Sequence, residues 1–201
     1  ALTEIRRVTA EEFSAAVSEE LAALSMPKAS VAFEITEREP TTHGADEVRL
    51  TFAAHESSIP DDIGKIASGG ELSRVMLAIE VVRAASESIP TYVFDEVDAG
   101  VGGKAAVEIG RRLAKLARNA QVIVVTHLPQ VAAWADTHVT IVKDDDAETV
   151  RSGVQELTDA ERVVELSRML AGMDESASAK AHAAELLDNA RQVKEAGVGS
   201  K

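Results

Sequence analysis

PTYVFDE at residues 90–96 is a short apolar run that ends in two adjacent carboxylates. Such a run is typical of a strand buried on both faces, as strands are in a parallel sheet. A second run of this kind, at residues 121–126, follows a helical pattern at residues 102–118 and precedes His127. Buried strands that alternate with helices predict an α/β fold with a mostly parallel sheet and flanking helices. Because ligands of such sheets bind beyond the carboxyl ends of the strands, we expect the functional side chains there.

The remaining pattern adds helices and strands around this sheet. A third strand is expected at residues 138–142, and the acidic run at residues 144–146 predicts a hairpin turn into a strand at residues 149–155. Helical spacing is found at residues 70–85, 128–135, 159–170 and 176–195.

The N-terminal part has a different pattern. Residues 2–24 place their apolar side chains largely on one face of a helix, which Pro27 ends. Residues 31–35 and 48–52 alternate apolar and polar side chains, so we expect an antiparallel strand pair. The helix is either a surface helix packed on the core or the end of a coiled-coil stem that returns to a globular head. The expected organisation is a stem or first helix at residues 1–26, a head domain at residues 27–196 and a disordered tail at residues 197–201.

Composition excludes several classes of function. The 201 residues include no cysteine, which rules out disulfides and thiolate chemistry within the chain. A net charge of −13 disfavours a general DNA-binding surface, because phosphate contacts need Lys and Arg. Aromatic residues make up only 3%, which argues against base stacking as the main mode of binding. No apolar run approaches the roughly 18 residues of a membrane span, so we expect no membrane contact.

The turn Ser68-Gly69-Gly70-Glu71 opens the helix predicted at residues 70–85. Ser68 and Glu71 have the spacing of a capping box, which begins many ordinary helices. The two glycines between them are harder to explain by capping, because glycine raises the entropic cost of starting a helix. They favour a site where something approaches the backbone closely. The free N–H groups of a helix N-terminus bind anions, phosphate above all.

Two polar pairs end the apolar strands. Side chains of neighbouring strand residues point in different directions, so Asp95 and Glu96 can have different roles. One carboxylate can hold the hydration shell of Mg²⁺, and the other can orient and deprotonate a water. Thr126 and His127 end the next strand, where the histidine could donate a hydrogen bond to a phosphate oxygen. Solvated acids at a strand end and a structural histidine are the ordinary alternatives.

Taken together, these motifs stand in the order and spacing of the ABC ATPases. The turn at residues 68–71 resembles the signature motif, FDE the end of Walker B, and Thr126-His127 the switch histidine. At position 71 the chain has Glu, where ABC transporters usually have Gln. In this respect the motif resembles that of the SMC-like branch of the family. The stretches KIASGGELSRVMLAIEVV, VFDEVDAGVGGKAAVEIGRRL, VTHLPQVAAWAD and RVVELSRMLAG resemble the RecN family of DNA repair proteins, over about residues 24–187.

The resemblance implies an ATP sandwich between two heads. Ser68, Gly69 and Gly70, with Glu71 in the same motif, would contact the γ-phosphate of an ATP that the second head holds. Asp98 would lie in the D-loop at the dimer interface.

The same resemblance assigns the hydrolytic residues. Asp95 would bind the hydration shell of Mg²⁺, Glu96 would be the general base for the attacking water, and His127 would sense the γ-phosphate. The family acts in recombinational repair of DNA double-strand breaks, which places the complete protein on DNA in the bacterial cytoplasm, associated with the nucleoid.

The chain lacks the Walker A motif GxxxxGK[ST], which wraps the β- and γ-phosphates. Residues 100–105, GVGGKA, end in Ala and follow the Asp-Glu strand, so they are interpreted as a D-loop that continues into a helix. In this family Walker A lies in an N-terminal half, beyond a long coiled coil. We therefore expect this chain alone to be inactive as an ATPase and to need that half as its partner. Two alternatives stay open: a head fragment of another SMC-type or Rad50-type protein, and, in isolation, a non-catalytic protein-interaction module.

Overall fold

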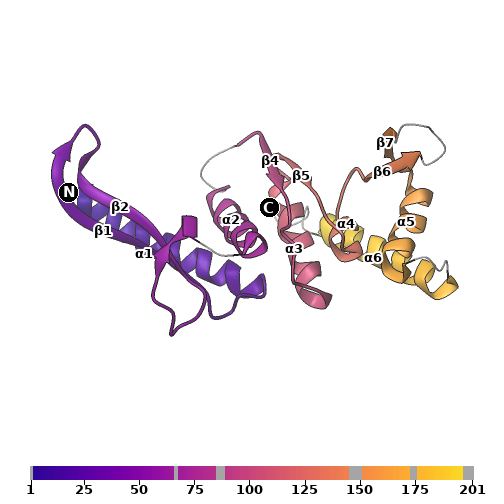
Figure 1. Ribbon diagram of the computed structural model, residues 1–201, viewed down its shortest axis with the longest axis horizontal. Helices are drawn as coiled ribbons and strands as arrows, with labels where there is room; N and C mark the ends of the chain where they lie inside the picture. Colours follow the sequence, from indigo (N-terminus) through magenta and orange to yellow (C-terminus); the bar gives the residue numbers. More distant parts are fainter. Residues whose placement is uncertain (1, 66–67, 85–88, 145–150, 173–175, 197–201) are drawn as a thin grey trace. The chain divides into compact units, whose positions relative to one another are not determined.

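A computed structural model describes residues 2–65, 68–84, 89–144, 151–172 and 176–196 (Figure 1). It divides into two compact units, Ala1–Val125 and Thr126–Lys201, which are described separately. The tail expected at residues 197–201 lies outside the described residues. Among the described helices, none combines the length and the apolar content that crossing a bilayer requires.

The first unit begins with a helix that carries a long hairpin. Helix α1 (Leu2–Ala23) lies along strands β1 (Ser30–Thr41) and β2 (Gly44–Ala53), which pair antiparallel (Figure 1). The rings of Phe13 and Phe33 meet edge to face with centroids 5.8 Å apart. The helix at Leu2–Ala23 and the antiparallel pairing of β1 with β2 confirm the predicted helix and strand pair. The strands are longer than predicted because main-chain pairing continues into a polar stretch where apolar alternation stops.

The far end of this hairpin is tied to the start of α1. Asp46 on β2 accepts hydrogen bonds from Thr3 and Arg6. The Arg6 hydrogen bond is the main reason that the pKa of Asp46 lies below its usual value. Near its base, β2 also pairs with the two-residue strand β3 (Asp61–Asp62), which leads into the 3-10 turn η1 (Ile63–Lys65).

The second half of this unit contains the strand–helix alternation. Helix α2 (Gly69–Arg83) leads to strand β4 (Thr91–Phe94), helix α3 (Gly103–Leu116) and strand β5 (Gln121–Val124). The two strands pair in parallel, as predicted, from Thr91↔Gln121 to Phe94↔Val124. One face of this sheet buries Tyr92 and Phe94.

The opposite face of the β4–β5 sheet is exposed, which corrects the prediction of strands buried on both faces. Val93, Ile123 and Val125 are 69%, 47% and 60% exposed. Val93 lies opposite Ile123 in the register, and Val125 is two residues further along, so the three share one face. We call this surface the open sheet face.

The second unit consists of helix α4 (Pro129–Ala132), strands β6 (Val139–Asp144) and β7 (Arg151–Glu156), and helices α5 (Asp159–Ala171) and α6 (Ala177–Ala196). Strand β6 pairs antiparallel with β7, which confirms the predicted hairpin. Strands β4 and β5 belong to the first unit and β6 to the second, so the expectation that residues 138–142 add to the parallel sheet stays a prediction. Asp145 and Asp146, where the turn is predicted, lie outside the described residues.

Helices α4, α5 and α6 form the core of the second unit. Leu166 on α5 is fully buried and clusters with Ala132, Ala133, Ala183 and Leu187. We expect Leu166→Ala to lower the free energy of unfolding by about 2–5 kcal/mol, because it leaves a cavity in this cluster. Urea unfolding followed by circular dichroism measures the change. Val164→Ala on the same helix is the control, since Val164 is 44% exposed and its variant should differ from the parent by less than about 0.5 kcal/mol. Equal effects of the two substitutions would contradict this description of the core.

Candidate functional site

The N-terminus of α2 is built by Ser68. Its backbone is extended, and its hydroxyl oxygen accepts a hydrogen bond from the N–H of Glu71 at 3.4 Å. This is the first half of the predicted capping box. The Ser68 carbonyl accepts the first helical bond, from the N–H of Leu72. Ser68 and Gly69 are exposed, whereas Gly70 is buried and the Glu71 N–H is bonded to the Ser68 hydroxyl. This 15-residue helix therefore opens toward solvent at its first residue, at the end where the helix dipole attracts anions.

The two glycines allow other atoms to approach the backbone closely, and in this structure those atoms belong to Ala99 and Glu96 of the same chain. A Cβ added to Gly70 would lie 2.8 Å from Cβ and 3.1 Å from the carbonyl oxygen of Ala99. A Cβ added to Gly69 would lie 2.8 Å from Oε2 of Glu96. The loop after β4 therefore packs directly on the start of α2. The sequence predicts a need for close approach here, and only the structure identifies this loop as one of the groups that approach.

This loop carries the two predicted carboxylates. Asp95 and Glu96 directly follow β4, and both are exposed. Glu96 has a backbone φ of 56°, in the left-handed region that few residues other than glycine adopt. The Glu96 carbonyl accepts a hydrogen bond from the N–H of Ala99 at 3.0 Å, which closes a tight turn. Such a conformation stores about 1–3 kcal/mol of strain and needs surrounding contacts to hold it.

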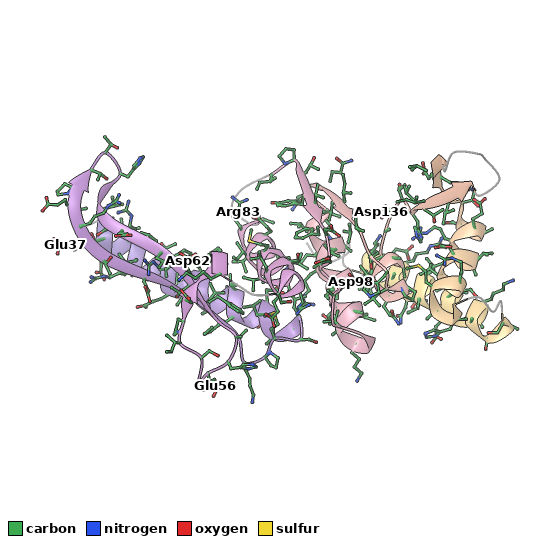
Figure 2. The ribbon with its side chains drawn as sticks, viewed as in Figure 1. Glu37, Glu56, Asp62, Arg83, Asp98 and Asp136 are labelled. Atoms are coloured by element: carbon green, nitrogen blue, oxygen red, sulfur yellow. The ribbon has the colours of Figure 1, made fainter. Side chains whose placement is uncertain are left out.

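Asp98 lies inside the same loop and is only 1% exposed. Figure 2 shows it at the turn that follows β4. The Asp98 carbonyl accepts a hydrogen bond from the N–H of Val101 at 3.3 Å, and Gly100 takes a positive φ between them. Gly100 is exposed, as are Asp95 and Glu96, whereas the Asp98 side chain belongs to the interior of the unit.

Two further residues of α2 hold this loop, and sequence reasoning did not assign them a role. The Ser73 hydroxyl donates to the carbonyl of Asp95 at 2.8 Å, and the Arg74 Nη1 donates to the carbonyl of Ala99 at 2.8 Å. Arg74 is 8% exposed, and burial lowers the pKa of its guanidinium. The sequence signal is their spacing: Ser73 and Arg74 come four residues after Gly69 and Gly70, which places them one turn later on the same face of the helix.

Thr126 and His127 begin the second unit. The N–H of Leu128 donates to the Thr126 hydroxyl at 3.1 Å, which forms a local turn before α4, and the side chain of His127 is exposed. After α4, buried Arg162 on α5 donates to the carbonyl of Ala135 at 2.8 Å. The approach of His127 to Glu96 stays a prediction.

The described residues contain no group of three or more histidine or acidic side chains placed to hold a metal ion. Asp95 and Glu96 are nevertheless exposed neighbours in the sequence, and carboxylate oxygens are the ligand type that Mg²⁺ prefers. Mg²⁺ usually keeps several waters and takes one or two carboxylates together with substrate phosphates. The residues present therefore fit a shared site in which the nucleotide supplies the other ligands.

The chain is similar to bacterial DNA repair proteins along nearly its whole length. It is 57% identical over 204 residues to DNA repair protein RecN of Streptomyces coelicolor, covering 95% of the chain and 36% of that protein. The RecN proteins of Mycobacterium tuberculosis H37Rv and Bacillus subtilis are 48% and 35% identical and cover 94% and 98% of the chain. The chain spans about a third of the length of these relatives. No protein-family model matches it.

The chain is also similar to solved structures of SMC head domains. An Smc head with a coiled coil and joint from Pyrococcus yayanosii aligns with a TM-score of 0.59 and 22% identity, covering 82% of the chain and 30% of that structure. The Smc head of Pyrococcus furiosus, solved with an extended coiled coil and the C-terminal domain of ScpA, aligns with a TM-score of 0.57 and 23% identity, covering 83% and 40%. At this identity the similarity shows the fold, and it confirms the predicted α/β head architecture.

Proposed function

Because this chain is RecN-like along nearly its whole length, we propose that it is the C-terminal part of an ATPase head that acts in recombinational repair of DNA double-strand breaks. One observation carries the proposal. The glycine turn at the start of α2 and the Asp95-Glu96 pair are packed against each other, so closely that a Cβ at Gly69 would lie 2.8 Å from Oε2 of Glu96. An ordinary capped helix and two unrelated solvated acids would not need this contact. In a dimer of ATPase heads both parts are used, the glycine turn toward the nucleotide of the opposing head and the carboxylate pair toward the nucleotide of its own head, and the contact joins the two.

The start of α2 is the proposed phosphate-binding element. The positive end of the helix dipole, at the exposed residues Ser68 and Gly69, attracts the γ-phosphate of an ATP held by a second head. Ser68, Gly69 and Gly70 make these contacts, and Glu71 keeps the turn closed by donating its N–H to the Ser68 hydroxyl. Asp98 shapes the loop that presents Gly100 to that second head.

The hydrolytic residues lie at the carboxyl end of β4 and after β5. Bound Mg²⁺ would screen the phosphate charges, with its hydration shell held by Asp95. Glu96 accepts the proton of the attacking water, and its exposed carboxylate suits that role. His127 donates a hydrogen bond toward a γ-phosphate oxygen. ATP and Mg²⁺ are therefore the proposed cofactors.

Exposed apolar surface supports an N-terminal half of the same protein as the first partner. Three sets of apolar side chains are exposed, each within one element or sheet: Leu2, Ile5 and Val8 on α1; Val93, Ile123 and Val125 on the open sheet face; and Val139, Ile141 and Val154 on the β6–β7 hairpin. Contiguous exposed apolar side chains of this kind mark interaction surfaces. The helical spacing of the first set suits a second stem helix, in agreement with a coiled coil at residues 1–26.

The proposal is tested by supplying that half. We expect this chain alone to show no ATP hydrolysis above background, and the same chain co-expressed with the N-terminal part of its parent protein to show Mg²⁺-dependent phosphate release. Phosphate release is measured for the chain, for the N-terminal part and for the two together, with and without a chelator. Tight ATP binding by the chain alone would contradict the dependence on a Walker A partner. Absence of hydrolysis by a folded complex of both parts would contradict the ATPase assignment.

Each of the two other candidate functions predicts a different observation. A head from another SMC-type or Rad50-type protein would be expected to match those proteins better than RecN, whereas the relatives described above are all RecN proteins. An interaction module without catalysis would bind protein partners through the acidic surface, and it would leave the packing between Glu96 and Gly69 without a use. We place the complete protein on DNA in the bacterial cytoplasm, as a dimer of heads.

A further inference from the structure

Ser73 and Arg74 are neighbours on α2, and their side chains donate hydrogen bonds to the two ends of the loop at residues 95–99. The Ser73 hydroxyl donates to the carbonyl of Asp95, at the start of the loop, and Arg74 donates to the carbonyl of Ala99, at its end. Both distances are 2.8 Å. Between the two bonds lie Glu96, in its left-handed conformation, and the buried Asp98.

These bonds are well placed to hold a strained turn. The left-handed backbone conformation of Glu96 is unfavourable by itself, so the contacts around the turn must offset its conformational free energy. The Ala99 N–H closes the turn on the Glu96 carbonyl, and the Gly70 position admits Ala99 at a distance that any side chain would prevent. Arg74 is more than nine-tenths buried, so its bond to Ala99 is shielded from water.

Packing alone does not require an arginine at position 74. A leucine or methionine would fill a buried position on α2 without desolvating a charge, and removing a guanidinium from water is expensive. Its Nε finds no hydrogen-bond partner among the described residues, so the cation is not fully satisfied in this state. A buried, incompletely paired arginine is maintained at a cost in stability, which is reasonable when its bond to the loop serves function.

We propose that Ser73 and Arg74 are positioning residues that make the α2 N-terminus and the loop at residues 95–99 move as one body, and so couple the two nucleotide sites of a head dimer. The inference rests on the proposed function. In that arrangement the α2 N-terminus contacts the nucleotide of the opposing head, whereas Asp95 and Glu96 serve the nucleotide of their own head. A displacement of α2 by one nucleotide is then transmitted to the general base that acts on the other.

The test uses the complete protein that carries this chain, with ATP as the ligand. Arg74→Met keeps an unbranched side chain of similar width in place of the aliphatic stem and removes the donor, whereas Arg74→Lys keeps a donor. We expect Arg74→Met to lower kcat about tenfold, with the KM for ATP within about twofold of the parent and a Hill coefficient that falls toward 1. Arg74→Lys should recover most of kcat, and Ser73→Ala should reduce kcat about threefold.

Arg83→Met is the matched control, because Arg83 lies at the far end of the same helix and pairs with Glu80 (Figure 2). It should leave kcat and the Hill coefficient at parental values. Thermal melting of each variant separates folding from positioning, and rates are given per folded protein. Parental kcat and Hill coefficient in Arg74→Met, or equal losses in the Met and Lys variants, would overturn the inference. The proposed function would survive either result as long as the parent hydrolyses ATP and loses that activity when Glu96 is replaced.

Discussion

Replacing Glu96 by Gln in the complete protein should lower the rate of ATP hydrolysis by about 10²–10⁴-fold, the range that a positioned general base contributes. ATP binding and ATP-dependent dimerisation should remain. Glutamine keeps the size of the side chain and can still hydrogen-bond water, but its amide cannot take the proton. The backbone at this position is left-handed, and Gln tolerates that conformation no better and no worse than Glu, so the turn is expected to persist.

Phosphate release under saturating ATP measures the loss, and size-exclusion chromatography with ATP measures dimerisation. Glu185→Gln is the control for removing one negative charge, because Glu185 is exposed on α6 and distant in sequence from both motifs. It should hydrolyse ATP at the parental rate. Hydrolysis at the parental rate by the Glu96→Gln variant would contradict the role of Glu96 as general base. Loss of ATP binding would show that the carboxylate is needed to bind the nucleotide and does not act on the attacking water.

The strand–helix order of the first unit was predictable because each element has a local signal. The runs at residues 91–94 and 121–124 are too apolar and too short for helices, and the amphipathic spacing of residues 103–116 is distinct. Burial was less predictable. A run such as Thr91–Phe94 looks the same whether a second layer covers its outer face or not, so the exposure of Val93 could not be foreseen. A covering layer is a tertiary feature, and it leaves no mark on the pattern of the strand itself.

The site was predictable at the level of motifs and not at the level of contacts. Asp95 and Glu96 are recognisable because two carboxylates end a short apolar strand, and Gly69 and Gly70 because two glycines are unexpected in the first turn of a helix. The roles of Ser73 and Arg74 required coordinates, because a side chain that bonds a carbonyl more than twenty residues away has no local pattern. The left-handed φ of Glu96 is likewise a product of tertiary contacts, since its sequence neighbours give no turn signal that requires it.

Alanine at Gly69 and alanine at Gly70 should both reduce ATP hydrolysis, but the two substitutions should differ in their effect on stability. At Gly70 the new Cβ meets Ala99 Cβ at 2.8 Å and two backbone oxygens, of Ala99 and Glu96, at 3.1 and 3.2 Å. None of these atoms is the end of a flexible side chain, so the loop must shift. We expect Gly70→Ala to lower the free energy of unfolding by about 1–3 kcal/mol, as overpacking does, and to reduce hydrolysis as well.

At Gly69 the atom of the described residues that the new Cβ meets is Oε2 of Glu96, at 2.8 Å. A carboxylate can rotate away, and alanine is a better helix former than glycine by up to about 1 kcal/mol, so Gly69→Ala should unfold at the parental denaturant concentration or above it. The same rotation removes the Glu96 carboxylate from its place, and the methyl group covers the exposed start of α2. Hydrolysis should therefore fall about tenfold or more while stability is kept. Urea unfolding and phosphate release on the two variants of the complete protein separate these effects. If Gly69→Ala hydrolyses ATP at the parental rate, then the contact between the glycine turn and Glu96 is packing alone, and the observation on which the proposed function rests loses its force.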